Sequence, residues 1–271
     1  MGKRLIFAAQ LSFTVSVCAF LIVPVILSIM AGITSNFLVG IESGLTVRWI
    51  GEVWGLYAET IYLSLLIAIS SLVVNLLIGV PAAYALARQG GRLSRFIEET
   101  IVLPVAVPGL AIALALIISY GGLREFRSSW LFILVGHILY TMPFMVRSVL
   151  AVLLSMNFRE LEEGGASLGA SFWYRFRTII LPNCKSGILA GSLMVITLSI
   201  GEFNLTWMLH TPITKTLPVG LADSYASMRL EVASAYTLIF FIMIVPLLIA
   251  MQLMSREKKT VAIDIDRESP R

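Results

Sequence analysis

A few polar side chains interrupt the long apolar stretches of this 271-residue sequence, and chemistry could occur there. An ionisable group inside a lipid-buried helix is costly, so it usually faces a cavity or a partner. Glu202 is the clearest case, because Ser199 and Thr206 lie three and four residues from it, on the same side of a helix. Polar residues in two other apolar stretches complete the candidate set: Asn75, His137 and Thr141. We expect these side chains to line one path for a solute.

Each of these residues also has a structural interpretation. Serine and threonine at helical spacing, like the pair Gly187-x-x-x-Gly191, commonly allow membrane helices to pack closely. His137 could equally be a hydrogen-bonded core histidine. Glu202 could belong to a buried ion pair or be a protonated structural carboxyl, instead of a pathway or gate group.

Several kinds of active site are missing from the sequence. There is no G-x-x-x-x-G-K-[ST] phosphate loop, no paired-cysteine motif and no H-E-x-x-H motif. Gly165-x-Ser167-x-Gly169 matches the nucleophile pattern G-x-S-x-G, but that pattern needs a preceding strand and a histidine partner, and the two histidines are His137 and His210. We therefore expect no catalytic residue, no metal site and no cofactor in this chain.

The composition is that of a membrane protein, with 58% hydrophobic and 13% charged residues. A span needs about 20 mostly apolar residues. Six stretches qualify, approximately Leu5–Met30, Thr60–Ala87, Ile101–Tyr120, Trp130–Val149, Ser186–Met208 and Ala235–Met254. The sequence predicts an all-α membrane protein with six transmembrane helices, made of a transmembrane domain over residues 1–255 and a tail over 256–271.

The distribution of positive charge predicts the orientation. Fifteen of the 20 Lys and Arg residues fall at the two termini and in the loops on the same side of the six predicted spans. Cytoplasmic loops hold this excess, so both termini and the loop over about residues 155–182 should be cytoplasmic. The net charge of +4 is explained in this way, and we predict no nucleic-acid partner.

That loop contains the pattern of a short exposed helix. Asn157 can cap a helix that begins at Phe158, with Glu160 in the capping-box position, and Gly169 can end it. Apolar residues at three- and four-residue spacing share one face, while the remaining positions are polar: Phe158, Leu161, Gly165 and Leu168 against Arg159, Glu162 and Glu163. Ser171 can cap a second helix, which should stop near Pro182.

The spacing in this loop resembles a known signature. The loop contains Glu163-Gly164-Gly165, then Gly169 after three residues, then Ile179-Ile180-Leu181-Pro182 after nine more. This spacing resembles the "EAA" motif of ABC importer permeases, whose loop forms the coupling helix that docks on the ATPase subunit. Two glycines replace the usual alanines, and each costs a helix about 1 kcal/mol. The resemblance implies the following docking residues: Arg159, Leu161, Glu162, Glu163, Ala166, Leu168 and Gly169.

The resemblance continues with Gly201-Glu202-Phe203 and Leu217–Gly220, which are most similar to the polyamine, aminoethylphosphonate and ferric-ion branch of these permeases. It implies the type I, MetI-like importer fold in a bacterial inner membrane. It also implies a second permease subunit, a solute-binding protein, and ABC ATPase subunits that hold ATP and magnesium. Two alternatives are an ion-coupled secondary transporter and a membrane-embedded enzyme. The first should show repeat-related broken helices and the second a clustered catalytic set, and the sequence shows no convincing internal repeat and no such cluster.

Overall fold

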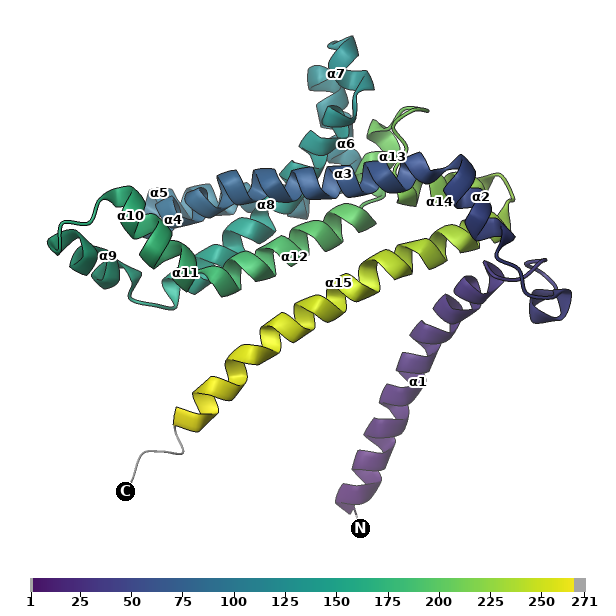
Figure 1. The fold of residues 1–271 in the computed structure, drawn as a ribbon, viewed down its shortest axis with the longest axis horizontal. Helices are drawn as coiled ribbons and strands as arrows, with labels where there is room; N and C mark the ends of the chain where they lie inside the picture. Colours follow the sequence, from purple (N-terminus) through teal and green to yellow (C-terminus); the bar gives the residue numbers. More distant parts are fainter. Residues whose placement is uncertain (1, 266–271) are drawn as a thin grey trace. The chain divides into compact units, whose positions relative to one another are not determined.

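The computed structural model describes residues 2–265, which are almost entirely helical (Figure 1). Within these residues the only β-type pairing is an isolated bridge between Thr34 and Leu45. Four helices are long and apolar enough to cross a membrane: Arg4–Ala31, Ala58–Gln89, Trp130–Leu154 and Leu230–Ala250. Two bent helix pairs bring the possible number of spans to six. The predicted all-α membrane fold is therefore confirmed, with two of its spans bent.

The first bent pair corrects the predicted third span. Instead of one helix over 101–120, α5 (Gly91–Ala106) and α6 (Gly109–Tyr120) meet at an angle of 103°. Val107 is extended between them, with φ −92° and ψ 133°, and Pro108 follows it. Proline disfavours a helical conformation in the residue before it and lacks an N–H, so the helix breaks at this dipeptide.

The second bent pair lies between the predicted loop and the fifth span. α10 (Phe172–Arg175), a π-helical turn (Phe176–Ile180) and α11 (Leu181–Asn183) precede α12 (Lys185–Gly201), and the two parts meet at 71°. The predicted continuous helix over 186–208 is wrong at its outer end. α12 stops at Gly201, Glu202 is extended with ψ 122°, and the short α13 (Asn204–Leu209) follows.

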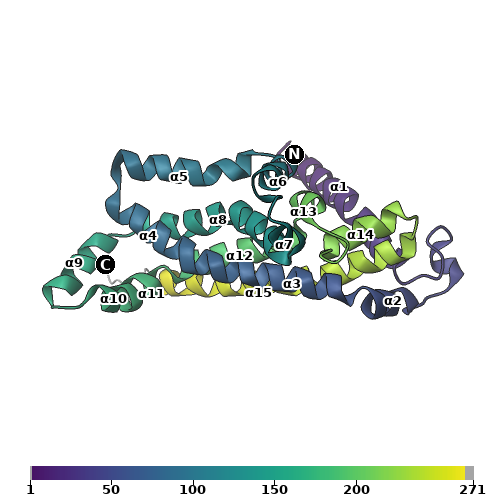
Figure 2. The ribbon, with the colours of Figure 1, turned by 90° about the horizontal axis from the view of Figure 1, so that it is seen from above.

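Two compact units make up the chain, and the larger comprises Glu59–Pro218 and Ile244–Arg271. Its remaining elements are α3 (Ala58–Val74), the π-helical turn η2 (Asn75–Gly79), α4 (Val80–Gln89), α7 (Arg124–Ser128), α8 (Trp130–Leu154) and α9 (Phe158–Ser167). α3, η2 and α4 run on without a break, and α8 contacts α4, η2 and α12 (Figure 2). α8 is therefore the centre of this unit.

Close helix contact explains two of the glycines in α12. A Cβ on Gly187 would lie 2.5 Å from the carbonyl oxygen of Ser148, and one on Gly191 would lie 2.8 Å from the sulfur of Met145. Both neighbours belong to α8, so α12 approaches α8 through its small residues, as in other membrane helix pairs. The packing predicted for the Gly187-x-x-x-Gly191 pair is confirmed.

The smaller unit comprises Met1–Ala58 and Val219–Met243. It contains α1 (Gly2–Ala31), a 3-10 turn (Gly40–Ser43), α2 (Arg48–Leu56), most of α14 (Leu217–Ala226) and the first part of α15 (Leu230–Ile265). Arg229 donates to the hydroxyl of Tyr57 at 2.6 Å and pairs with Glu52. The hydrogen bond to Glu52 raises the pKa of Arg229, so this guanidinium stays charged and fixes α2 beside the start of α15.

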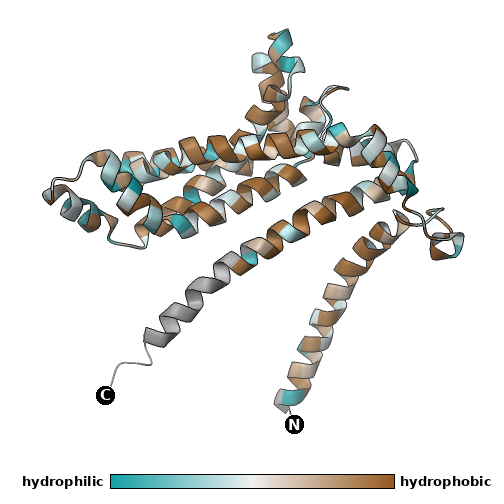
Figure 3. Ribbon diagram, in the orientation of Figure 1, coloured by the Kyte–Doolittle hydropathy of each residue, from teal (hydrophilic) through white to brown (hydrophobic). Residues whose placement is uncertain are grey.

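Apolar residues follow the lengths of the long helices, and polar residues gather at the turns and short helices that join them (Figure 3). α15 continues to Ile265, into the segment predicted as a tail, whereas residues 266–271 of that segment lie outside the described residues.

Candidate functional site

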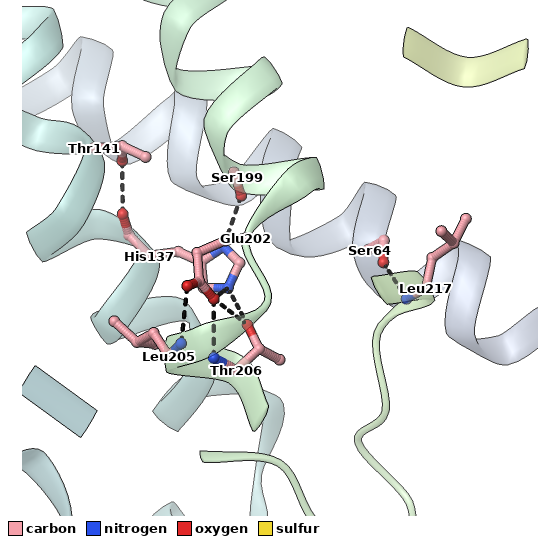
Figure 4. Close-up of polar contacts among 8 residues, drawn as sticks. All are labelled: Ser64, His137, Thr141, Ser199, Glu202, Leu205, Thr206 and Leu217. Carbon is pink, nitrogen blue, oxygen red and sulfur yellow. Dashed lines mark hydrogen bonds and ion pairs between the residues drawn. The ribbon is translucent and has the colours of Figure 1, made fainter. Parts of the chain in front are cut away.

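Glu202 lies at the break between α12 and α13 and caps the shorter helix (Figure 4). Its Oε1 accepts the backbone N–H of Leu205 at 2.8 Å, and its Oε2 accepts the N–H and the hydroxyl of Thr206, both at 2.9 Å. The first N–H groups of a helix have no partner within that helix, and a carboxylate is well suited to accept them. The carboxylate thus satisfies donors that the break in the span leaves free.

His137 of α8 connects this cap to α12. Its Nε2 lies 2.8 Å from Oγ1 of Thr206, and its Nδ1 lies 2.8 Å from Oγ of Ser199. Because the Thr206 hydroxyl donates to Glu202, it accepts from Nε2–H, and Nδ1 then accepts the proton of the Ser199 hydroxyl. A neutral imidazole satisfies every one of these contacts, so His137 joins both sides of the break to α8.

The network continues along α8 towards the second span. Thr141 donates to the carbonyl of His137 at 2.7 Å, and Asn75 Nδ2 donates to Oγ1 of Thr141 at 3.0 Å. Asn75 begins the π-helical turn η2, a distortion often found at functional positions. Its Oδ1 and the hydroxyl of Ser71 are buried without a partner among the described residues.

The six predicted path residues therefore meet in one place, although five of them lie on four different elements and Glu202 lies at the break between two of these. Five of them are buried, and Glu202 is half-buried, with its side chain 8% exposed. The prediction that Ser199, Glu202 and Thr206 lie on one side of a continuous helix is wrong, because the helix breaks at Glu202. Contacts to His137 assemble the group instead. A role in solute passage stays a prediction for these residues.

The second candidate site is the loop helix α9, whose end has the predicted form. Gly169 has φ +79°, a conformation that favours glycine. Its N–H donates to the carbonyl of Ala166 at 2.9 Å, and the next N–H, of Ala170, donates to the carbonyl of Gly165 at 3.0 Å. This pair of bonds is a Schellman motif, which ends the helix.

The start of α9 differs from the prediction. Asn157 precedes the helix, but its side chain accepts no backbone N–H and instead lies 3.5 Å from the carboxylate of Glu160. The predicted capping box is therefore not formed, because the two side chains contact each other and not the first turn. Ser171 does cap α10 as predicted, accepting the N–H of Tyr174 at 3.4 Å.

α9 presents different faces from those that the residue pattern predicts. Phe158 and Glu162 are buried, and Gly165 lies against Ile179, whereas Leu161 is 48% and Leu168 89% exposed. The other predicted docking residues are exposed: Arg159, Glu163, Ala166 and Gly169. Polarity alone placed Glu162 outside, but its carboxylate finds partners within the chain. Leu161 and Leu168 remain available to a partner.

Those partners of Glu162 come from two helices. Its Oε1 accepts the hydroxyl of Tyr84 at 2.7 Å and lies 3.6 Å from Arg88 Nη1 and 3.9 Å from Arg175 Nη2. Tyr84 and Arg88 belong to α4, and Arg175 belongs to α10. None of the three was predicted as a site residue. The four-residue spacing of Tyr84 and Arg88 on one helix face was the available signal.

Arg159 provides a further link between α9 and α4. Its guanidinium donates to the carbonyls of Ala87 and Arg88 at 3.1 and 2.9 Å. A cation there satisfies carbonyls that the end of α4 leaves free and interacts favourably with the helix dipole. The residues around Arg159 line a polar cavity of about 220 Å³, namely Arg88, Glu162, Glu163 and Arg175.

Residues 75–260 match the sequence model of a family described as binding-protein-dependent transport system inner membrane component. A relative from Salmonella typhimurium, provisionally described as the 2-aminoethylphosphonate transport system permease protein PhnV, is 26% identical over 91% of this chain and 92% of its own. The molybdenum transport system permease protein ModB of Haemophilus influenzae is 29% identical over 74% of this chain and 95% of its own.

A solved structure gives the same fold. The bacterial alginate ABC transporter, determined in complex with a periplasmic protein bound to alginate pentasaccharide, contains a chain that superimposes with a TM-score of 0.69. The match covers 93% of this chain and 94% of that one at 17% sequence identity, so it concerns the fold alone.

Proposed function

Because the chain belongs to the binding-protein-dependent transport system inner membrane components, we propose that it forms half of the solute path of an ATP-driven importer. A second permease subunit supplies the other half. ABC ATPase subunits, which hold ATP and magnesium, lie beneath the pair, and a binding protein delivers the solute from outside. This chain itself carries no cofactor and no catalytic residue. The termini and the α9 loop face the cytoplasm.

The proposed contact with the ATPase subunit is supported by the way in which α9 is held on the chain. The helix is held to the chain by its inner face, through Phe158, Arg159 and Glu162, while Leu161 and Leu168 are exposed on the outside. An amphipathic helix with exposed leucines is suited to a partner's apolar groove. We infer that the ATPase subunit receives these leucines, with Glu163 beside them.

We further propose that the solute is small and carries an amine, as 2-aminoethylphosphonate does. The support is the PhnV relative, which extends over nearly the whole chain. The Glu202 carboxylate accepts three protein donors, so we infer that it holds the break in the span and leaves selection of the amine to another component. We therefore assign selection of the solute to the binding protein. The buried network around Glu202 and His137 is assigned the structural role of stabilising the path.

Two measurements test this proposal. Affinity purification of the chain from its native membrane should retain an ABC ATPase and a second permease, and Leu168→Glu should release the ATPase while the second permease stays bound. Mass spectrometry of the solute held by the associated binding protein should identify an amine-bearing compound. Loss of the second permease from the Leu168→Glu preparation would show general misfolding, and retention of the ATPase would show that α9 is not its docking element.

A further inference from the structure

The inner face of α9 contains a link to a distant part of the chain. α9 is joined to its neighbours in sequence through turns at residues 155–157 and 168–171. The hydrogen bond between Glu162 and Tyr84, in contrast, spans 78 residues of sequence and reaches α4 directly. Because α3, η2 and α4 form one continuous helix, a displacement of α9 that moves α4 also moves the whole second span.

The contacts at Glu162 are suited to transmit such a displacement. The residue is 5% exposed, and one oxygen, Oε1, is shared by the hydroxyl of Tyr84 and the guanidinium groups of Arg88 and Arg175. Arg175 also donates to the backbone carbonyl of Glu162 at 3.2 Å. The hydrogen bond from the Tyr84 hydroxyl to the Glu162 carboxylate is short and buried, so it resists displacement more than exposed ion pairs do.

Aromatic packing fixes the position of the Tyr84 hydroxyl. The ring of Tyr84 lies 6.4 Å from that of Phe158, 6.0 Å from that of Phe172 and 5.4 Å from that of Phe176, centre to centre. These rings come from α9, α10 and the π-helical turn after it. The hydroxyl therefore cannot follow Glu162 away from α4 without disturbing three elements.

We propose that Glu162 is a positioning residue that passes movement of α9 to the second span through Tyr84. This inference rests on the proposed function, in which a partner ATPase moves α9. The outer face of the helix holds the partner, and the Glu162 carboxylate holds the span. Closely packed elements joined in this way move as rigid bodies, so displacement of α9 reaches η2, where Asn75 contacts Thr141 of α8.

Two variants remove the link in different ways, and a third variant serves as the control. Glu162→Gln removes the charge shared by the two arginines, and Tyr84→Phe removes only the hydroxyl while keeping the ring packing. Glu160→Gln makes the same charge change on the exposed side of the same helix. Hydrogen exchange of the α9 amides in the assembled complex should become about tenfold faster in the first two, the effect of losing one hydrogen bond to a charged group. It should be unchanged in Glu160→Gln.

The second readout separates positioning from mere folding. Proteoliposomes containing the complex and its binding protein are given 2-aminoethylphosphonate, and uptake is divided by ATP hydrolysed in the same sample. We expect this ratio to fall at least fivefold in Glu162→Gln and Tyr84→Phe and to stay at the parental value in Glu160→Gln. Unchanged exchange in both variants overturns the inference, as does faster exchange with a parental ratio. Absence of uptake by the parent complex contradicts the proposed function instead, and the exchange result still decides whether Glu162 holds α9.

Discussion

Replacing Glu202 by glutamine should destabilise the permease before it alters solute selection. The carboxylate accepts three protein donors at 2.8 to 2.9 Å, two of them backbone N–H groups at the start of α13. Glutamine keeps the shape and one acceptor, but its amide nitrogen would face a donor. Since a hydrogen bond to a charged group contributes about 1.5–3 kcal/mol, we expect a loss of roughly 2–4 kcal/mol.

The assay is thermal unfolding of the assembled complex in nanodiscs, followed by intrinsic fluorescence. A loss of this size should lower the melting temperature by about 5 °C or more. Ser192→Ala is the matched control, because Ser192 lies on α12 and its hydroxyl donates to the carbonyl of Ile188, one turn earlier in the same helix, at 2.7 Å. That variant should melt within about 1 °C of the parent, since it breaks no link between elements.

Uptake measured on the same samples decides the interpretation. If Glu202 caps α13, uptake in Glu202→Gln should fall only in proportion to the complex that remains assembled. A variant that melts like the parent yet has lost uptake of amine-bearing solutes would refute this reasoning. It would show that the carboxylate acts on the solute and that its contacts to Leu205 and Thr206 are dispensable.

Three further results are expected. Gly164→Ala should stabilise α9 by about 1 kcal/mol and tighten ATPase binding, because no other part of the described chain lies within 4 Å of the new methyl group. Gly165→Ala should gain less, because its methyl group would lie 2.9 Å from a neighbouring side chain, and hydrogen exchange of α9 measures both effects. Gly169→Pro should abolish solute-stimulated ATP hydrolysis while the protein still inserts, because proline cannot adopt the φ of +79°, and parental stimulation would contradict this. Arg127→Gln should speed exchange at the end of α13, because the guanidinium donates to the Leu209 carbonyl at 2.7 Å; an unchanged rate would mean that water replaces it.

The apolar stretches and the end of α9 were predictable because their causes are local. Hydropathy over about 20 residues identifies a span wherever it occurs. Gly169 ends α9 because only its own φ and the preceding turn are involved. The bend in the third span and the break at the outer end of the fifth were not predictable in the same way, since a hydropathy window does not record the direction of the chain. Pro108 was a visible signal for the first bend, whereas Glu202 looked like part of a continuous helix.

The roles of individual polar residues depended on contacts that the sequence does not display. Glu162 and Glu163 are adjacent and chemically identical, yet one is buried against α4 and the other is exposed. The contacts of Glu162 with Tyr84, 78 residues earlier, and with Arg88 and Arg175 distinguish the two. In the same way, His137 contacts both Ser199 and Thr206 across the break after α12. The predicted polar residues therefore lie together, although the continuous helix expected to hold them is absent from the described residues.

ATP-driven uptake by the reconstituted complex tests the central claim most directly. Proteoliposomes with both permeases, the ATPase enclosed with ATP and the binding protein outside should accumulate 2-aminoethylphosphonate above the external concentration. Omitting this chain, or replacing ATP by a non-hydrolysable analogue, should abolish accumulation. Accumulation that persists without this chain, or that follows an ion gradient in the absence of ATP, would contradict the account.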